Sequence, residues 1–210
     1  MDSATFWDRI AEKYAAQPVA DPAAFDRKIA ITRAKMTPDA VVLDIGCGTG
    51  SLALRLADAA REVHGLDASP EMIRIAEGKA QKAGAQNVRF HCGPFDDTFT
   101  TFAPGSLDGV CAYSILHLVD DRRAALRQMH ALLKPGGFFI SSTACLGGPR
   151  AILLGPVLAI MRLIGKAPKI ALFTAETLAE DIRAAGFVDV EITDVGARPD
   201  VGFIVARKPG

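Results

Sequence analysis

One stretch near residue 45 restricts the fold of this chain more than any other. Val41-Val42-Leu43-Asp44-Ile45 is an almost continuous apolar run, and Gly46-Cys47-Gly48-Thr49-Gly50 follows it without a gap. Such a run predicts a strand that is buried on both faces of a parallel sheet. The spacing of Leu52, Leu54 and Leu56 predicts that a helix begins directly after the glycines. The order of strand, glycine-rich loop and helix therefore predicts an α/β fold.

The place of these glycines also indicates a binding site. In an open α/β sheet, ligands bind outside the carboxyl ends of the strands. Glycines there allow a sharp turn and a close approach of a ligand, and the N-terminus of the next helix offers unpaired N–H groups to an anion. The alternative is a plain tight turn, but the three alternating glycines, Gly46, Gly48 and Gly50, are more than a turn requires.

Strands and helices alternate along the rest of the chain. The predicted strands are 41–45, 63–66, 88–92, 107–113, 138–143, 187–195 and 201–207, and the predicted helices are 5–17, 23–36, 52–60, 69–84, 120–133 and 174–185. The last two strands are joined by so few residues that they can pair only antiparallel. We therefore expect a single domain over residues 1–210, built on a doubly wound, seven-stranded, mostly parallel sheet with a C-terminal antiparallel hairpin. Residues 1–37 form an N-terminal helical cap.

Composition argues against a strong electrostatic partner, a disulfide framework and a metal site. The 210 residues carry 24 Lys plus Arg and 24 Asp plus Glu, so a net charge of zero supplies no overall attraction to nucleic acid or to an anionic membrane. Cys47, Cys92, Cys111 and Cys145 form no C-x-x-C pair, so neither a disulfide framework nor a metal site is indicated. The first residues do not read as a secretory leader, and we therefore expect a cytoplasmic protein.

Asp67 marks a second part of the predicted site. It ends the second strand, 21 residues after Gly46, close to the spacing at which an acidic residue binds a ribose in dinucleotide folds. The alternative is that Asp67 caps the next helix, but Ser69 already stands at the better cap position. The glycines alternate as G-x-G-x-G, and Ser51 stands where the dinucleotide fingerprint has its third glycine.

Taken together, the motifs strongly resemble those of the class I S-adenosylmethionine-dependent methyltransferases, in the branch that acts on small molecules. The resemblance covers nearly the whole chain. The matching pieces are Phe6-Trp7-Asp8 through Tyr14, Val42 through Gly50, Gly65-Leu66-Asp67-Ala68-Ser69, Ser106-Leu107-Asp108-Gly109-Val110, Leu116-His117, Leu133-Lys134-Pro135-Gly136-Gly137 and Ala185-Gly186-Phe187.

The resemblance implies S-adenosylmethionine as the cofactor and assigns its contacts. The glycine loop would lie against the methionine part, with Asp44 facing its ammonium group directly or through water. Asp67 would hold the ribose hydroxyls, Ala68 and Met72 would line the adenine, and Tyr14 would close over the site. The cofactor-binding residues implied are Tyr14, Asp44, Gly46, Cys47, Gly48, Gly50, Asp67, Ala68, Met72, Gly93, Pro94, Phe95, Tyr113 and Ser114.

One segment departs from the family pattern. Many relatives have Gly-Asp-Ala after the third strand, with the Asp bonding the adenine amino group, whereas this chain has Gly93-Pro94-Phe95. Proline offers neither a carboxylate nor an N–H. Either Asp96 or Asp97 replaces that carboxylate, or Phe95 contributes ring contact and a backbone N–H.

The acceptor is predicted to be a small molecule. Tyr113-Ser114-Ile115-Leu116 stands where similar DNA and protein amino-group methyltransferases have an Asn-Pro-Pro-Tyr type of loop, which argues against nucleic acid. Tyr113 would stand near the reacting methyl group. His117 is the candidate general base, although a structural His that caps the loop is the alternative. An acid or base is optional, because methyl transfer mainly requires alignment in a dry pocket.

The segment 147–173 occupies the place where relatives build a lid over the acceptor. From 157 to 164 only Arg162 is polar, so a helix there needs cover from protein, substrate, a second subunit or a membrane surface. We expect an apolar or amphipathic acceptor, with a dimer or peripheral membrane contact through 151–165 as a further possibility. A bilayer span is excluded, because the stretch is short and contains Gly155-Pro156.

Two other functions compete with methyl transfer. An NAD(P)-dependent oxidoreductase would use the same sheet, but the glycine spacing and the C-terminal hairpin disfavour it. A protein that binds S-adenosylmethionine without catalysis would have the same motifs and would transfer no methyl group to any acceptor.

Overall fold

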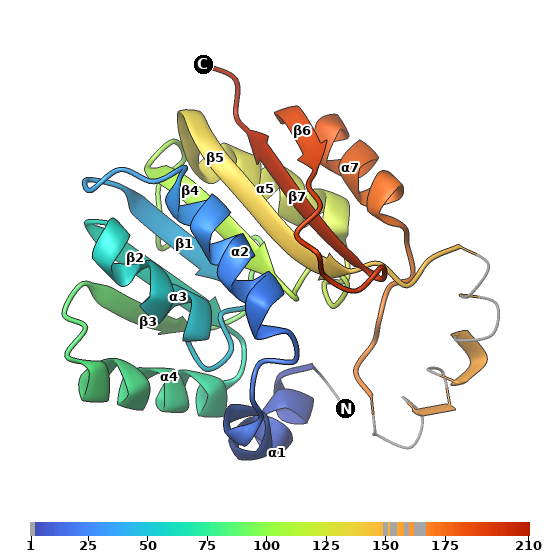
Figure 1. Ribbon diagram of the computed structural model, residues 1–210, viewed down its shortest axis with the longest axis horizontal. Coiled ribbons are helices and arrows are strands. Elements are labelled where there is room, and N and C mark those ends of the chain that lie inside the picture. Colours follow the sequence, from blue (N-terminus) through green and yellow to red (C-terminus); the bar gives the residue numbers. More distant parts are fainter. Residues whose placement is uncertain (1–2, 149–150, 152–154, 158–159, 162–166) are drawn as a thin grey trace.

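The first strand lies near the centre of one mixed sheet. Figure 1 shows the computed structural model, which describes residues 3–148, 151, 155–157, 160–161 and 167–210. The strands are β1 (Val41–Ile45), β2 (Glu62–Asp67), β3 (Val88–Cys92), β4 (Leu107–Tyr113), β5 (Leu133–Ala144), β6 (Val188–Ile192) and β7 (Val201–Arg207). Their order across the sheet is β3-β2-β1-β4-β5-β7-β6. Neighbours from β3 to β5 pair in parallel, and β7 runs antiparallel to β5 and β6. The predicted doubly wound, seven-stranded sheet is confirmed.

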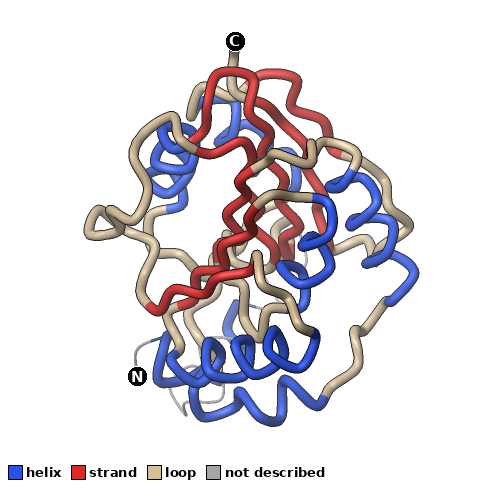
Figure 2. The backbone as a smooth tube through the Cα atoms, turned by 90° about the vertical axis from the view of Figure 1, so that its left-hand side faces the viewer, coloured by secondary structure: helices blue, strands red, loops and turns tan. Residues whose placement is uncertain are grey.

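Helices cover both faces of this sheet, as Figure 2 shows. They are α1 (Ser3–Ala16), α2 (Pro22–Arg33), α3 (Ser51–Leu56), α4 (Pro70–Ala83), α5 (Arg122–Leu132) and α7 (Ala175–Ala184), with a short 3-10 helix at Ala57–Ala59. Successive β1 residues point to opposite faces, because side chains alternate along a strand. Val42 packs into the core that α2 and α3 cover, and Leu43 packs into the core that α5 and α7 cover. Both faces of β1 therefore pack into apolar cores, as an apolar run through β1 predicts.

Side-chain caps define the starts of the helices that follow the strands. Ser69 Oγ accepts a hydrogen bond from the Met72 N–H at 3.1 Å and begins α4. Asp121 begins α5 by accepting from the Ala124 N–H at 2.9 Å. Such caps satisfy N–H groups that have no partner within the helix. The predicted positions of these two helix starts are confirmed.

Thr5 and Asp8 have the spacing of a capping box, which predicts that the first helix begins at Thr5, and this prediction is wrong. Thr5 and Asp8 both lie inside α1, which begins at Ser3. The Asp8 carboxylate instead accepts hydrogen bonds from Ser69 Oγ at 2.5 Å and from the Glu71 N–H at 3.2 Å. Asp8 therefore helps to cap α4, a helix more than 60 residues away.

Two strand boundaries also differ from the expected ones. Lys134-Pro135-Gly136-Gly137 was expected to separate a helix from a strand at 138–143, but β5 already begins at Leu133 and includes these residues. The Lys208 N–H donates to the Gly137 carbonyl oxygen, and the Gly136 N–H donates to the Lys208 carbonyl oxygen, which holds this irregular stretch beside the end of β7. The expected strand 187–195 is shorter, because β6 ends at Ile192 and Asp194 starts a turn by accepting from the Gly196 N–H.

Of the predicted lid at 147–173, residues 149–150, 152–154, 158–159 and 162–166 lie outside the described residues. The proposed role of the apolar stretch 151–165 is therefore not tested. Within the described ranges, no helix is both long enough and apolar enough to cross a membrane.

Candidate active site

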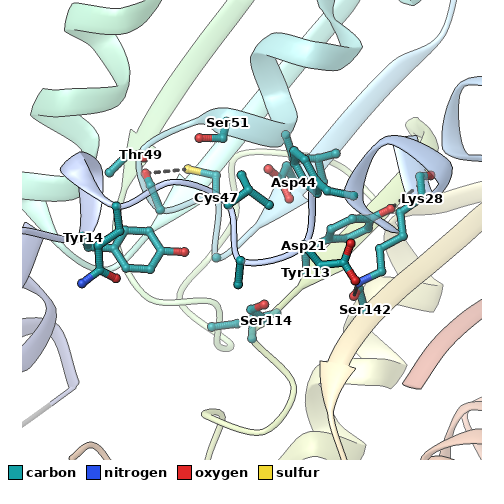
Figure 3. A pocket seen from close by; sticks show the side chains of 18 of the residues that line it. Tyr14, Asp21, Lys28, Asp44, Cys47, Thr49, Ser51, Tyr113, Ser114 and Ser142 are labelled. Atoms are coloured by element: carbon teal, nitrogen blue, oxygen red, sulfur yellow. Dashed lines mark hydrogen bonds between the residues drawn. The ribbon is translucent and has the colours of Figure 1, made fainter. Parts of the chain in front are cut away.

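A cavity of about 680 Å³ lies at the carboxyl ends of the parallel strands. Its wall combines α1, the segment 17–22, α2, the glycine loop, the ends of β2, β4 and β5, and the start of β7. The volume is within the range of roughly 300–1,000 Å³ that is usual for small-molecule sites. Figure 3 shows Tyr14 at one end of this cavity and Asp21, Lys28 and Ser142 at the other.

Most residues implied by the resemblance meet at this cavity. Those that line it are Tyr14, Asp44, Gly46, Cys47, Gly48, Asp67, Met72, Tyr113 and Ser114. Those that are not part of its lining are Gly50, Ala68, Gly93, Pro94, Phe95 and His117. The structure therefore brings most of these residues together at one cavity, while their roles stay predictions.

The carboxylate of Asp67 ties the end of β2 to the glycine loop. Its Oδ2 accepts a hydrogen bond from the Gly48 N–H, and its Oδ1 accepts one from the Ser69 N–H, each at 2.9 Å. Gly48 has a φ of +53°, a backbone conformation that side chains disfavour. Burial raises the pKa of Asp67, although the two N–H groups oppose this by favouring its charged form. The glycine therefore allows a turn that aims backbone donors at a carboxylate.

Asp44 is a buried carboxyl group whose side chain lines the cavity. It is 1% exposed, and neither of its oxygens has a hydrogen-bond partner among the described residues. Burial raises its pKa well above the ordinary value, and repulsion from Asp67 adds to this rise. A cation in the cavity would relieve both costs, because it favours the ionised form of each carboxylate.

Comparison with known proteins identifies the family of this chain. The chain matches the methyltransferase domain family over residues 42–137. It is 32% identical over 190 residues to a demethylmenaquinone methyltransferase of Geobacillus stearothermophilus, covering 79% of this chain and 78% of that protein. The chain belongs to the class I S-adenosylmethionine-dependent methyltransferases. Its cofactor is S-adenosylmethionine.

Two further comparisons extend this result. The methyltransferase is 35% identical over 106 residues to a ubiquinone biosynthesis O-methyltransferase of Xanthomonas campestris, covering 50% of this chain and 44% of that one. Its fold resembles that of Haemonchus contortus phosphoethanolamine N-methyltransferase 2, solved with phosphomonomethylethanolamine and S-adenosylhomocysteine. The TM-score is 0.79 at 20% identity, over 100% of this chain and 61% of that one. This second likeness concerns the fold alone.

Gly50 serves packing in the methyltransferase rather than the cavity. A Cβ added there would lie 2.8 Å from Cζ of Phe90 and 3.0 Å from Cβ of Ala76. The glycine therefore lets the start of α3 approach the strands and α4 closely.

The two expected catalytic side chains differ in their surroundings. The Tyr113 hydroxyl lies 2.9 Å from Oγ1 of Thr32, and burial raises its pKa far above the ordinary value, so it stays protonated. His117 does not line the cavity, its Nδ1 has no partner among the described residues, and burial lowers its pKa. Its position gives no support to the expected role as a general base.

The segment after β3 packs inward. The ring centroid of Phe95 lies 5.6 Å from that of Phe99, and both pack against the core beneath α5. The Asp96 carboxylate accepts from the N–H and hydroxyl of Thr98, so it is engaged in its own turn. Neither Asp96 nor Asp97 lines the cavity. The choice among these candidate adenine contacts remains a prediction.

Sequence reasoning missed the residues at the far end of the cavity. Lys28 of α2 donates to Oγ of Ser142, at the end of β5, at 2.8 Å. Asp21, the N-cap of α2, and Arg198, in the loop before β7, line the same end. No local pattern marks these residues, because they come from three separate parts of the chain: α2 with its N-cap, β5 and the loop before β7.

Proposed function

We propose that this methyltransferase transfers the methyl group of S-adenosylmethionine to a small acceptor with an apolar or amphipathic body, by in-line displacement. The observation that carries the proposal is one cavity in which Asp44 and Asp67 line one end and apolar side chains contribute much of the remaining wall. The demethylmenaquinone and ubiquinone methyltransferases similar to this chain support it, since their names refer to quinones, which are small, largely apolar molecules.

In this proposal, one half of the cavity holds the cofactor. When bound, S-adenosylmethionine supplies an electrophilic methyl group on a positively charged sulfur. Asp67 accepts hydrogen bonds from the ribose hydroxyls, and Asp44 faces the ammonium group. Gly46 and Gly48 admit the methionine part against the backbone, and the buried side chain of Met72 forms an apolar wall for the adenine. The unpartnered oxygens of Asp44 fit this cofactor, because its positive charges favour an ionised carboxylate there.

The other half of the cavity holds the acceptor. Apolar side chains of Val19, Phe25, Ile115, Leu118 and Val201 contribute to the wall. They exclude water and align the nucleophile of the acceptor with the methyl group, which is most of what this reaction requires. His117 has no part in this proposal.

The test begins with calorimetric titration of the protein with S-adenosylmethionine and S-adenosylhomocysteine. A mass-spectrometric search of a cell extract for molecules that gain one methyl group follows. We expect both ligands to bind and the methylated products to be largely apolar. A set of acceptors made up only of highly polar molecules would overturn the acceptor class. Binding of both ligands without methylation of any acceptor would indicate a binding protein without catalysis.

A further inference from the structure

The charge of the cavity changes sign along the edge of the sheet. From β2 to β7, the neighbouring strands carry Asp67, Asp44, Tyr113 and Ser142 at their carboxyl ends, followed by Val201 at the start of β7. Carboxylates occupy the first two of these positions. The cations Lys28 and Arg198 line the cavity at the β5 and β7 end together with the carboxylate of Asp21, and the cation Lys79 lines it beside the glycine loop. Because neighbouring strands lie about 4.8 Å apart, Asp44 on β1 and Ser142 on β5 are separated by roughly 10 Å across the sheet.

This arrangement gives each end of the cavity a different preference. A molecule with a positive sulfonium and ammonium is favoured at the carboxylate end. The cationic end, two strands away, favours an acceptor that carries negative charge.

Lys28 is the cation that the structure holds in place. Its ammonium group donates to Oγ of Ser142, whose side chain is buried at 5% exposure. Burial lowers the pKa of Lys28, and the carboxylate of Asp21 opposes this by favouring the charged form. Arg198 is exposed, and its guanidinium already pairs with Asp200 at 3.2 Å. Lys28 is therefore the better placed of the two cations to bind a ligand inside the cavity.

The backbone that carries Lys28 is fixed to the sheet from both sides. The Tyr113 hydroxyl lies 3.4 Å from the Lys28 carbonyl oxygen and 2.9 Å from the Thr32 hydroxyl. The neighbouring Arg27 donates through Nε to the Val195 carbonyl oxygen at 2.6 Å. Ser142 is held in turn, because its carbonyl oxygen accepts from the Ser114 N–H at 2.6 Å. The ammonium group is thus positioned before any acceptor arrives, which lowers the entropic cost of binding.

We propose that Lys28 binds an acidic hydroxyl of the acceptor, a phenol or an enol, as its anion. The proposal rests on the function proposed above and names its substrate class. A single ammonium group, partly offset by Asp21, fits one singly charged oxygen better than a phosphate dianion. The apolar side chains of Phe25 and Val201 on the same wall fit the ring that bears such an oxygen.

Ionisation releases the hydroxyl proton to solvent, and Lys28 keeps its own protons throughout. The phenolate then supplies the electron pair that forms the bond to the methyl carbon. The carbon–sulfur bond breaks, and sulfur keeps its electron pair as a neutral thioether. The negative charge of the phenolate and the positive charge of the sulfonium are thereby neutralised in the same step.

The test uses 4-nitrophenol, whose anion absorbs visible light, with the full-length protein saturated with S-adenosylhomocysteine. Absorbance measured against pH reports the ionisation of the bound phenol. We expect binding to the wild-type protein to lower the pKa of 4-nitrophenol, so that half-ionisation occurs at a proton concentration at least tenfold higher. A cation within about 4–6 Å has such an effect. Lys28→Met should abolish the shift and weaken binding of the phenolate about tenfold or more, and Lys28→Arg should restore most of both.

Two controls keep this result interpretable. Lys79→Met removes another cation of the cavity wall, bonded to Oγ1 of Thr49 at 2.7 Å, and should leave the 4-nitrophenol shift in place. Calorimetric titration with S-adenosylhomocysteine shows whether each variant is folded and binds the cofactor product.

Three outcomes would each overturn a different claim. Equal phenolate binding by the wild type and Lys28→Met, both with normal affinity for S-adenosylhomocysteine, would overturn the role of Lys28. If benzoate binds in a Lys28-dependent manner and 4-nitrophenol does not bind, the proposed acceptor class is wrong, and the acceptor carries a carboxylate rather than a phenol. Failure of the wild-type protein to bind S-adenosylhomocysteine would instead overturn the proposed function.

Discussion

At the scale of single residues, Asp44 lowers the stability of the ligand-free protein and is proposed to strengthen binding of the cofactor. Its side chain is fully enclosed at the end of β1, and its oxygens have no partner among the described residues. A buried polar group without a partner costs about 1–3 kcal/mol. We expect Asp44→Asn to raise the free energy of unfolding of the ligand-free protein by about 1 kcal/mol, because it removes a charge that burial and Asp67 both disfavour. The same change should weaken binding of S-adenosylmethionine at least tenfold.

Urea unfolding and calorimetric titration of the two proteins measure these effects. Asn has nearly the shape of Asp, so a large loss of stability in Asp44→Asn would show that the carboxylate has a structural partner and would contradict the prediction.

The raised pKa of Asp44 has a consequence for pH dependence. Because the ordinary value is 3.8 and the folded value is higher, the folded state holds a proton that the unfolded chain has already released. The stability of the ligand-free protein therefore falls as pH rises from about 3.8 through the folded pKa. A cationic ligand favours the ionised carboxylate, so its affinity should rise over the same range of pH. Titrations with S-adenosylmethionine from about pH 5 to about pH 7.5 test this, and Asp44→Asn should flatten the profile.

Asp67 should behave differently from Asp44. Its oxygens already accept from the N–H groups of Gly48 and Ser69, so Asp67→Ala removes structural hydrogen bonds together with the predicted ribose contacts. We expect weaker binding of S-adenosylmethionine by tenfold or considerably more, because hydrogen bonds to a charged group contribute about 1.5–3 kcal/mol each. Asp67→Asn, which keeps one acceptor oxygen, should lose less of both affinity and stability. Unchanged affinity in Asp67→Ala would place the ribose elsewhere.

The residues of the cofactor half could be predicted from the sequence for a simple reason. Asp44, Gly48 and Asp67 each follow or end a buried strand, and the carboxyl ends of parallel strands meet at one edge. Lys28 and Ser142 could not be predicted, because they are 114 residues apart and meet only when α2 packs on the sheet.

At the scale of elements, α1 is held to the molecule mainly through α4. Asp8 accepts from Ser69 Oγ and the Glu71 N–H, and exposed Glu12 pairs with Arg74. Tyr14, 45% exposed near the end of α1, lies over the glycine loop, 3.9 Å from the position of a Cβ on Gly48. The end of α1 therefore covers the cofactor end of the cavity.

We expect Asp8→Ala to loosen α1 without unfolding the sheet. Loss of the hydrogen bonds to α4 costs about 1–2 kcal/mol, and an element with few buried contacts opens first. Hydrogen exchange of α1 amides should become severalfold faster, while exchange in β1 and β4 should be unchanged. Glu12→Ala, which removes only an exposed ion pair, is the matched control and should have little effect. Equal protection of α1 in Asp8→Ala and the wild type would show that other contacts hold the helix.

The elements that sequence patterns predicted well are those defined by local chemistry. The apolar run of β1 and the cap at Ser69 each require only neighbouring residues. The contact of Asp8 with Ser69 and the early start of β5 beside Lys208 both involve residues that are distant in the sequence, and no local pattern reveals them.

At the scale of the whole molecule, neutrality conceals an uneven distribution of charge. The 24 acidic and 24 basic side chains cancel overall, yet the cavity wall has Asp44 and Asp67 at one end and Lys28 at the other. Repulsion between the two carboxylates is a cost that the ligand-free protein bears and that a cationic ligand removes.

Ligand binding should therefore stabilise the entire fold. At a concentration of S-adenosylhomocysteine about 100 times its Kd, binding adds about 2.7 kcal/mol to the free energy of unfolding. For a chain of this size we expect Tm to rise by roughly 5–10 °C, measured by differential scanning calorimetry. At the same ligand concentration, Asp44→Asn should start from a higher Tm and gain less. A gain equal to that of the wild type would contradict the role proposed for Asp44.

The hydrogen bond from Arg27 to Val195 joins residues 168 positions apart. During synthesis, a chain that has emerged through β5 already contains β1 to β5 and every residue proposed to hold the methyl donor. At that stage the hydrogen bond of Arg27 cannot form, because its acceptor, the Val195 carbonyl oxygen, has not been synthesised. Contacts between such distant positions form late, whereas a ligand stabilises any state that binds it. A ligand that binds these residues would therefore stabilise a partly synthesised chain before Arg198 and Val201 complete the wall of the cavity.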